Sequence, residues 1–244
     1  MIRLLFFKIL TSNKIKKYER ENIIMFDNRK RKAERLKSYQ FDEVSPRSYN
    51  CIIGAMLVYG FAFNLIFFGL LGDLVSTWNW IVSAIASLLL VIAGSIISTK
   101  SQKPILSFLG YNFILFADSM LISLIIPFYS IDQIILAFSI TIGITLCMMA
   151  LSSIFPQFFS KLGLTLFFSL LIFVVIEIIA MLLGYRGDLF NWIFVGIFSL
   201  YIGYDWHKAQ NYPKTIDNAV DSTIDLYVDI INIFVRILDL LDSN

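Results

Sequence analysis

From Tyr49 to the carboxyl end, the chain alternates long apolar runs with short stretches rich in Gly, Pro, Ser, Asn and charged residues. A helix needs about 20 apolar residues to cross the hydrocarbon core of a bilayer, so each run predicts a membrane-spanning helix. The runs cover residues 49–71, 77–98, 105–129, 131–154, 162–184, 190–208 and 219–241. The pattern therefore predicts an all-α integral membrane protein built as a bundle of seven transmembrane helices.

The last run differs from the others because its charged and polar residues fall on one side of a helix. At about 100° per residue, they lie within an arc of about 80°. This polar stripe consists of Asp221, Asp225, Asp229, Asn232, Arg236 and Asp239. A helix lying on a membrane surface would show a polar face about twice as wide. The narrow stripe predicts a helix inside the bundle, with the stripe lining an internal path; alternatively, Arg236 neutralises neighbouring acids within the same helix.

The composition supports a membrane protein. Hydrophobic residues make up 58% of the 244 residues and charged residues 16%, with a mean hydropathy of +0.76. This leaves too little polar surface for a water-soluble globule and excludes an ordinary soluble enzyme. We expect a basic arm over residues 1–47 and one membrane domain over residues 48–244. Cys51 and Cys147 lie in apolar runs, where we expect small packing residues and no disulfide.

Positive charge is concentrated at the beginning of the chain, where 13 of the 20 Lys and Arg residues precede Tyr49. After Tyr49, every second connection between the runs, on the same side as the amino terminus, contains lysines: Lys100, Lys103, Lys161, Lys208 and Lys214. The connections on the other side contain a single basic residue, Arg186. The positive-inside rule then places the amino terminus in the cytoplasm. We expect no cleaved signal peptide, a bacterial cytoplasmic membrane as the location, and Met25 as a possible alternative start. The arm either remains solvated or lies on anionic lipid headgroups.

Four acidic residues lie within the predicted spans. An ionisable side chain in hydrocarbon is costly and usually faces a cavity, a partner or an ion path. The four are Asp118, Glu177, Asp205 and Asp229, in the third, fifth, sixth and seventh spans. The basic residues within the predicted spans are only Arg236 in the last span and Lys100 at the edge of the second. This excess of acidic residues suits a path for a cation or a proton. For Asp118 and Glu177, a hydrogen-bonded tie between helices is an equal alternative.

Residues for enzymatic chemistry are scarce. The single histidine, His207, and two separated cysteines exclude the His/Cys clusters that hold zinc or haem. Asp205 and Asp229 lack the Gly-rich surroundings expected of a paired-aspartate membrane protease. We therefore expect no enzyme activity, no cofactor, no resident metal and no nucleic-acid partner.

Two motifs near the carboxyl end carry a family resemblance. Residues 200–205 read Leu-Tyr-Ile-Gly-Tyr-Asp, and residues 225–234 read Asp-Leu-Tyr-Val-Asp-Ile-Ile-Asn-Ile-Phe. The first resembles the Tyr-Asp that ends the sixth segment of the Bax inhibitor-1 family, also called transmembrane Bax inhibitor motif proteins. The second resembles the Leu-Tyr-x-Asp-x-Ile-Asn-x-Phe of its seventh segment. The chain is similar to bacterial members of this family over residues 135–241, although Asp118 stands where a small or weakly polar residue is expected.

The resemblance implies a bundle in which six helices surround the seventh, and a pH-sensitive calcium leak across the membrane. It also implies that an aspartate pair on the last two helices, Asp205 and Asp229 here, senses protons and gates the leak. Candidate supporting residues are Asp225, Asn232, Arg236, Glu177 and Asp118. The implied partners are the lipid bilayer, protons and calcium as the permeant ion. A basic residue of the second segment pairs with the site in the family, and Lys100 is the candidate in this chain.

The two aspartates implied as the sensor lie at different distances from the turn between the last two spans. Counted from Lys214, Asp205 lies nine residues back and Asp229 lies 15 residues on, a difference in depth of roughly 9 Å. The pair meets only if the last helix tilts or begins along the membrane interface.

The alternative function is a non-conducting regulator that binds another membrane protein, such as an envelope protease. A channel would depend on its intramembrane acids, whereas a regulator would depend on the basic arm or a lipid-facing patch.

Overall fold

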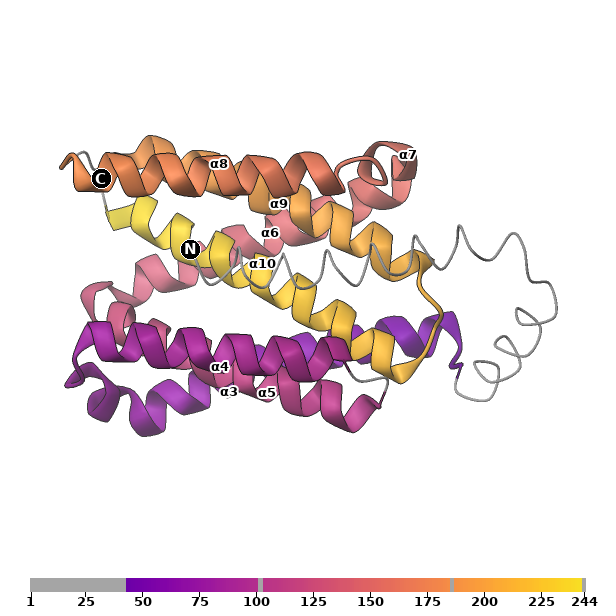
Figure 1. Ribbon diagram of the computed structural model, residues 1–244, viewed down its shortest axis with the longest axis horizontal. Helices are drawn as coiled ribbons and strands as arrows, with labels where there is room; N and C mark the ends of the chain where they lie inside the picture. The colour runs from indigo at the N-terminus through magenta and orange to yellow at the C-terminus, as the bar shows by residue number, and fades with distance from the viewer. Residues whose placement is uncertain (1–42, 101–102, 185–186, 243–244) are drawn as a thin grey trace. The chain divides into compact units, whose positions relative to one another are not determined.

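The computed structural model describes residues 43–100, 103–184 and 187–242 (Figure 1). The predicted basic arm up to residue 42, the possible start at Met25 and Arg186 lie outside these ranges. The described residues are almost wholly helical, which confirms the all-α prediction. The elements are α3 (Pro46–Ser76), α4 (Trp80–Lys100), α5 (Pro104–Ile125), the 3-10 turn η1 (Ile126–Phe128), α6 (Ile131–Ile154), α7 (Pro156–Phe159), α8 (Gly163–Leu182), α9 (Asp188–Asn211) and α10 (Ile216–Asp242).

Five helical segments of the described ranges are long and apolar enough to cross a membrane. They are α3, α4, α5 with η1, α6 and α8, and they coincide with the first five predicted spans. The last two predicted spans are helices as well, α9 and α10, but both carry more polar residues and do not belong to the five. A multi-pass membrane protein is therefore confirmed. Of the seven predicted spans, five are long and apolar enough to cross a membrane within the described ranges.

Local sequence explains where several helices begin and end. Ser45 caps α3 by accepting a hydrogen bond from the Ser48 backbone amide at 3.1 Å, and Pro46 follows at the first helical position. Ser130 and Gln133 form a reciprocal capping box at the start of α6. Gly184, with a φ of 80°, follows α8 in a left-handed conformation that glycine adopts without steric cost. These signals set the register in which the helices pack.

The helices form two compact units. The amino-terminal unit is described over residues 43–121 and 212–223, and so contains α3, α4, most of α5 and the first two turns of α10. The carboxyl-terminal unit contains residues 122–211 and 224–242, with α6, α7, α8, α9 and the rest of α10.

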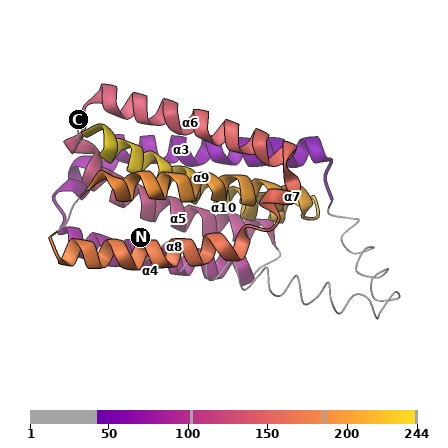
Figure 2. The ribbon, with the colours of Figure 1, turned by 90° about the horizontal axis from the view of Figure 1, so that it is seen from above.

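In the amino-terminal unit, α5 lies between α3 and α4 (Figure 2). On one side, α5 meets α4 closely at Gly94 and Gly110, where a Cβ built on either glycine would lie 2.5 Å from the carbonyl oxygen of the other. On the other side, the Ser119 hydroxyl is 2.7 Å from the Asn64 side-chain oxygen on α3. Small residues thus allow close backbone packing, and polar side chains bond across helices, as is typical of membrane bundles.

The glycine contact gives a first prediction. Gly94→Ala should place a methyl group against the α5 backbone and force the two helices apart, at a cost of about 1–3 kcal/mol. We expect the thermal unfolding midpoint in detergent to fall by roughly 3–10 °C. Gly54→Ala on α3 is the matched control, because a Cβ there meets nothing within 4 Å. Equal midpoints for the two variants would show that the close contact of α4 and α5 does not limit stability.

In the carboxyl-terminal unit, α9 packs between α6 and α8 (Figure 2). The Ser152 hydroxyl of α6 donates a hydrogen bond to the Gly203 carbonyl of α9 at 2.6 Å, and the Phe159 ring of α7 lies against Gly203. The Tyr204 ring packs in the same way on Gly163 at the start of α8. These contacts fix the carboxyl-terminal half of α9, which carries Asp205.

Between Ala219 and Leu240, most positions of α10 are buried and none is exposed. In its polar stripe, Asp225 and Asp229 are buried, with an exposed fraction of 0% for Asp229, and the other four residues are partly buried. A helix on the membrane surface would expose its polar face to water. The burial agrees with the prediction that the last helix lies inside the protein.

The prediction that the two cysteines pack in the interior is wrong. Cys51 on α3 and Cys147 on α6 are both exposed. The reason is that the lipid-facing side of a membrane helix is as apolar as its packed side. An apolar neighbourhood in the sequence therefore does not distinguish a buried position from one that faces lipid.

Candidate functional site

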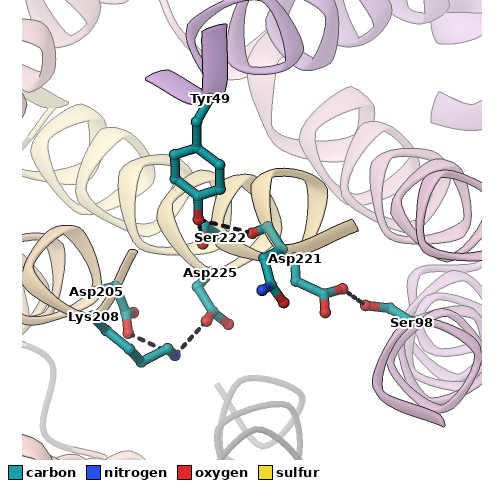
Figure 3. A network of polar contacts seen from close by, with 8 residues as sticks. Tyr49, Ser98, Asp205, Lys208, Asp221, Ser222 and Asp225 are labelled. Atoms are coloured by element: carbon teal, nitrogen blue, oxygen red, sulfur yellow. Dashed lines mark hydrogen bonds and ion pairs between the residues drawn. The ribbon is translucent and has the colours of Figure 1, made fainter. Parts of the chain in front are cut away.

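A buried charged cluster links α9 to α10 in the carboxyl-terminal unit (Figure 3). The Lys208 ammonium lies 3.2 Å from Asp205 Oδ1 and 2.5 Å from Asp225 Oδ2. The exposed fractions of the Asp205 and Asp225 side chains are 2% and 7%, and that of Lys208 is 10%. We call Asp205, Lys208 and Asp225 the acid–lysine cluster. With all three ionised, its two carboxylates and one ammonium sum to a charge of −1.

Helix geometry explains how the sequence assembles this cluster. Asp205 and Lys208 are three residues apart on α9, so their side chains share one face. The chain reverses between Asn211 and Ile216, where α9 ends and α10 begins. Counted from the middle of this turn, Asp205 and Asp225 lie at depths that differ by roughly 5 Å. The long Lys208 side chain spans the remaining distance.

Asp229, the second predicted proton sensor, lies one helical turn beyond Asp225 on α10 and is completely buried. It is thus about 6 Å further along the helix axis than Asp225. The structure links Asp205 to Asp225 through a shared lysine, whereas the family resemblance implies a pair of Asp205 and Asp229. The predicted difference in depth favours Asp225 as the residue of α10 that lies level with Asp205.

Lys208 is the site residue that the sequence analysis missed. Its charge was assigned to a cytoplasmic connection, but α9 continues to Asn211 and keeps Lys208 inside the helix. The three-residue spacing from an intramembrane acid was the available signal. A lysine at such a position can extend its flexible side chain toward carboxylates of a neighbouring helix.

A second charged group joins three helices of the same unit. The two terminal nitrogens of Arg236 on α10 lie 2.7 Å and 3.2 Å from the two carboxylate oxygens of Glu177 on α8. The same guanidinium donates to the Asn191 side chain of α9 at 2.8 Å and lies 4.4 Å from the Phe194 ring centroid. This fork-shaped pairing is the strongest geometry for an ion pair between side chains. The alternative that Arg236 neutralises acids of its own helix does not account for these contacts with α8 and α9. Glu177 connects α8 to α10 as an interhelical tie.

This tie gives a second prediction. Arg236→Gln should lower the free energy of unfolding by about 2–4 kcal/mol, because it leaves the Glu177 carboxylate with less compensation in a poorly solvated place. The double variant Glu177→Gln with Arg236→Gln should be more stable than Arg236→Gln alone, since it removes both charges. A double-mutant cycle measured by unfolding in detergent gives the coupling. Additive single effects would mean that the ion pair contributes nothing to stability.

Most other polar residues of the last helix bond to hydroxyl groups or to their own helix. Asp217 accepts a hydrogen bond from Ser107 at 2.5 Å, and Asp221 accepts one from Ser98, both within the amino-terminal unit. In the carboxyl-terminal unit, Asp239 accepts from the Tyr129 hydroxyl at 2.5 Å. Asn232 of the polar stripe donates to the backbone of its own helix at Val228. The polar residues of α10 thus make contacts with several different elements.

Asp118 lies on α5 in the amino-terminal unit and is 6% exposed. Within the ranges that the structure describes, no three His, Cys, Asp or Glu side chains form a group that could hold a metal ion.

Helices of membrane-spanning length with buried carboxylates and their counter-ions define a multi-pass α-helical membrane protein. A comparison with protein families identifies its kind more closely. The family described as "Inhibitor of apoptosis-promoting Bax1" matches residues 42–244. The chain therefore belongs to this family, the Bax inhibitor-1 family that its two carboxyl-terminal motifs resemble.

Individual relatives add little about function. Two Helicobacter pylori proteins, from two strains and each described as an uncharacterized protein, are 36% identical to this chain over 81 residues. The similarity covers 31% of this chain and 33% of each relative, so the match spans about one third of their length. No solved structure matches this chain.

Proposed function

We propose that this protein is a pH-sensitive calcium leak of a bacterial cytoplasmic membrane, gated by protonation of the buried carboxylates of α9 and α10. The observation that carries the proposal is the acid–lysine cluster, in which Asp205 and Asp225 share Lys208 with less than one tenth of each carboxylate side chain exposed. Asp229, one turn further along α10, is the third carboxylate of the proposed sensor. The protein acts without enzymatic chemistry or a resident cofactor.

Protonation would gate the leak by weakening the link between the two helices. With both carboxylates ionised, Lys208 makes charge-assisted bonds to each, which are roughly twice as strong as neutral hydrogen bonds. Two nearby carboxylates in a poorly solvated place also favour binding a shared proton, and the group then titrates as a unit. A proton on either one replaces an ion pair by a weaker bond. Acidification should therefore shift the packing of α9 and α10 toward a conducting arrangement.

Calcium suits an internal path of this kind because it binds hard oxygen ligands in flexible geometries. The carboxylates on α10 supply such oxygens along the helix. This requires that α9 and α10 also cross the membrane, giving seven spans with α10 surrounded by the others. The basic residues before Tyr49 and in alternate connections support a cytoplasmic amino terminus and a carboxyl terminus on the other side.

Calcium entry into vesicles tests the proposal. The full chain, purified and reconstituted into liposomes loaded with a calcium-sensitive dye, should admit calcium faster than protein-free liposomes, and the rate should rise as the pH falls. Potassium entry measured in parallel gives the selectivity. Folded protein that admits no calcium at any pH would overturn the leak and favour the alternative, a non-conducting regulator that binds another membrane protein.

A further inference from the structure

Cations gather at one end of the amino-terminal unit, at the ends of three helices. Arg47 lies at the start of α3, Lys100 at the end of α4 and Lys103 just before α5, and all three are exposed. Lys214, in the turn before α10, is partly buried. We call these four residues the basic rim. Glu43 is an exposed acid beside them, so the formal charge of rim and Glu43 together is +4 − 1 = +3.

Residues close in sequence to each part of the rim form hydrogen bonds to the first two turns of α10. Close to Arg47, the Tyr49 hydroxyl lies 3.0 Å from the Ser222 hydroxyl and donates to the Asn218 carbonyl at 3.2 Å (Figure 3). Two residues before Lys100, Ser98 donates to Asp221. Four residues after Lys103, Ser107 donates to Asp217. The start of α10 is therefore held by the same helix ends that carry the cations.

The segment that enters α3 is fastened to the turn before α10. The Val44 amide donates to the Lys214 carbonyl at 2.7 Å, and Glu43 forms an antiparallel bridge with Thr215. The Lys214 ammonium lies 4.5 Å from the centroid of the Tyr49 ring, and partial burial lowers the pKa of Lys214. We call the pairing of residues 43–44 with residues 214–215 the clip.

The sequence before the clip is also basic. Residues 1–42 contain 12 Lys and Arg and five Asp and Glu residues, so their formal charge is 12 − 5 = +7. The rim stands at the ends of α3, α4 and α5, which are all long and apolar enough to span a membrane. Cations at the ends of such helices lie at the depth of the lipid headgroups. Their charge is complementary to anionic headgroups, which attract basic segments at the cytoplasmic surface.

We infer that the basic rim binds anionic lipid headgroups and thereby holds the start of α10 in place. The clip and the bonds from Tyr49, Ser98 and Ser107 carry the effect from the headgroups to α10. Because Asp225 follows on the same helix, lipid charge regulates the proposed leak. The last step rests on the proposed function, whereas lipid binding and the ordering of α10 do not.

Hydrogen exchange of the full chain in lipid nanodiscs tests this inference without measuring transport. Exchange of the backbone amides in residues 44–49 and 214–222 should be roughly fivefold slower in phosphatidylglycerol than in phosphatidylcholine. High salt should remove the difference, because it screens surface charge. The variant with Arg47→Gln, Lys100→Gln and Lys103→Gln should show a much smaller difference. Lys161→Gln, which changes an exposed cation in the other unit, should retain it.

A further variant separates lipid binding from its transmission to α10. Tyr49→Phe removes the bonds to Asn218 and Ser222 but no charge. Slower exchange in phosphatidylglycerol should then persist at residues 44–47 and weaken at residues 218–222. Equal exchange of the wild-type protein in both lipids would overturn the inference, as would an undiminished effect in the triple variant. Slowing by polyglutamate in neutral nanodiscs, with none from phosphatidylglycerol, would overturn it in favour of an acidic protein partner.

Failure of the leak and failure of the lipid site are distinguishable. Lipid-dependent exchange in a protein that conducts no calcium would retain the site and reject the proposed function. Calcium flux without lipid-dependent exchange would retain the function and reject the site.

Discussion

Lys208→Gln is expected to raise calcium flux at neutral pH about tenfold and to leave little dependence on pH. The lysine is the ammonium that both Asp205 and Asp225 bind, so its loss removes the link between α9 and α10. A hydrogen bond to a charged group contributes about 1.5–3 kcal/mol, enough for a tenfold change in the closed population. Flux into dye-loaded liposomes measures the effect.

Lys161→Gln provides the control for this variant, since it removes an exposed lysine of the same unit without touching the cluster. It should conduct like the wild type at every pH. A Lys208→Gln protein that is folded and as tightly closed as the wild type at neutral pH would show that the lysine does not hold the leak shut.

Asp205→Asn is expected to abolish the pH dependence, because asparagine resembles a carboxyl group that is permanently protonated. Its flux at neutral pH should approach the flux of the wild type in acid, again about tenfold higher. Asp229→Asn should also flatten the pH profile, if the proton is shared among the buried carboxylates of α9 and α10. The measurement is the initial rate of calcium entry at a series of pH values on either side of neutrality.

Asp73→Asn is the matched control for both aspartate variants. Asp73 is an exposed residue near the end of α3, outside the acid–lysine cluster. Its replacement should leave the pH profile unchanged. If Asp205→Asn kept the wild-type profile, the proton sensor would have to be located elsewhere in the chain.

Helix positions were predictable because they depend on local sequence. All seven apolar runs coincide with helices, and the ends at Ser45, Ser130 and Pro156 follow known capping preferences. Hydropathy does not identify α9 and α10 as membrane spans, because the polar residues that give these helices their candidate function also lower it. Family membership was predictable from the ten residues 225–234, and a family comparison over residues 42–244 confirms it.

The pairing of charges was less predictable, because it depends on which helices are neighbours. The stripe on α10 marked Arg236 and Asp225 as candidates, but their partners Glu177 and Lys208 come from other helices. Lys208 is the last residue of the predicted run 190–208 and was therefore counted with the connection that follows, whereas α9 continues to Asn211. Cys51 and Cys147 illustrate the same limit, since sequence alone does not show whether a residue faces lipid or protein.

The most direct test of the central claim is the pH profile of calcium flux for the wild type, Lys208→Gln and Asp205→Asn in the same liposome preparation. We predict flux that rises with acidity in the wild type, and high flux with little pH dependence in both variants. Parallel profiles for all three folded proteins would contradict gating by the acid–lysine cluster.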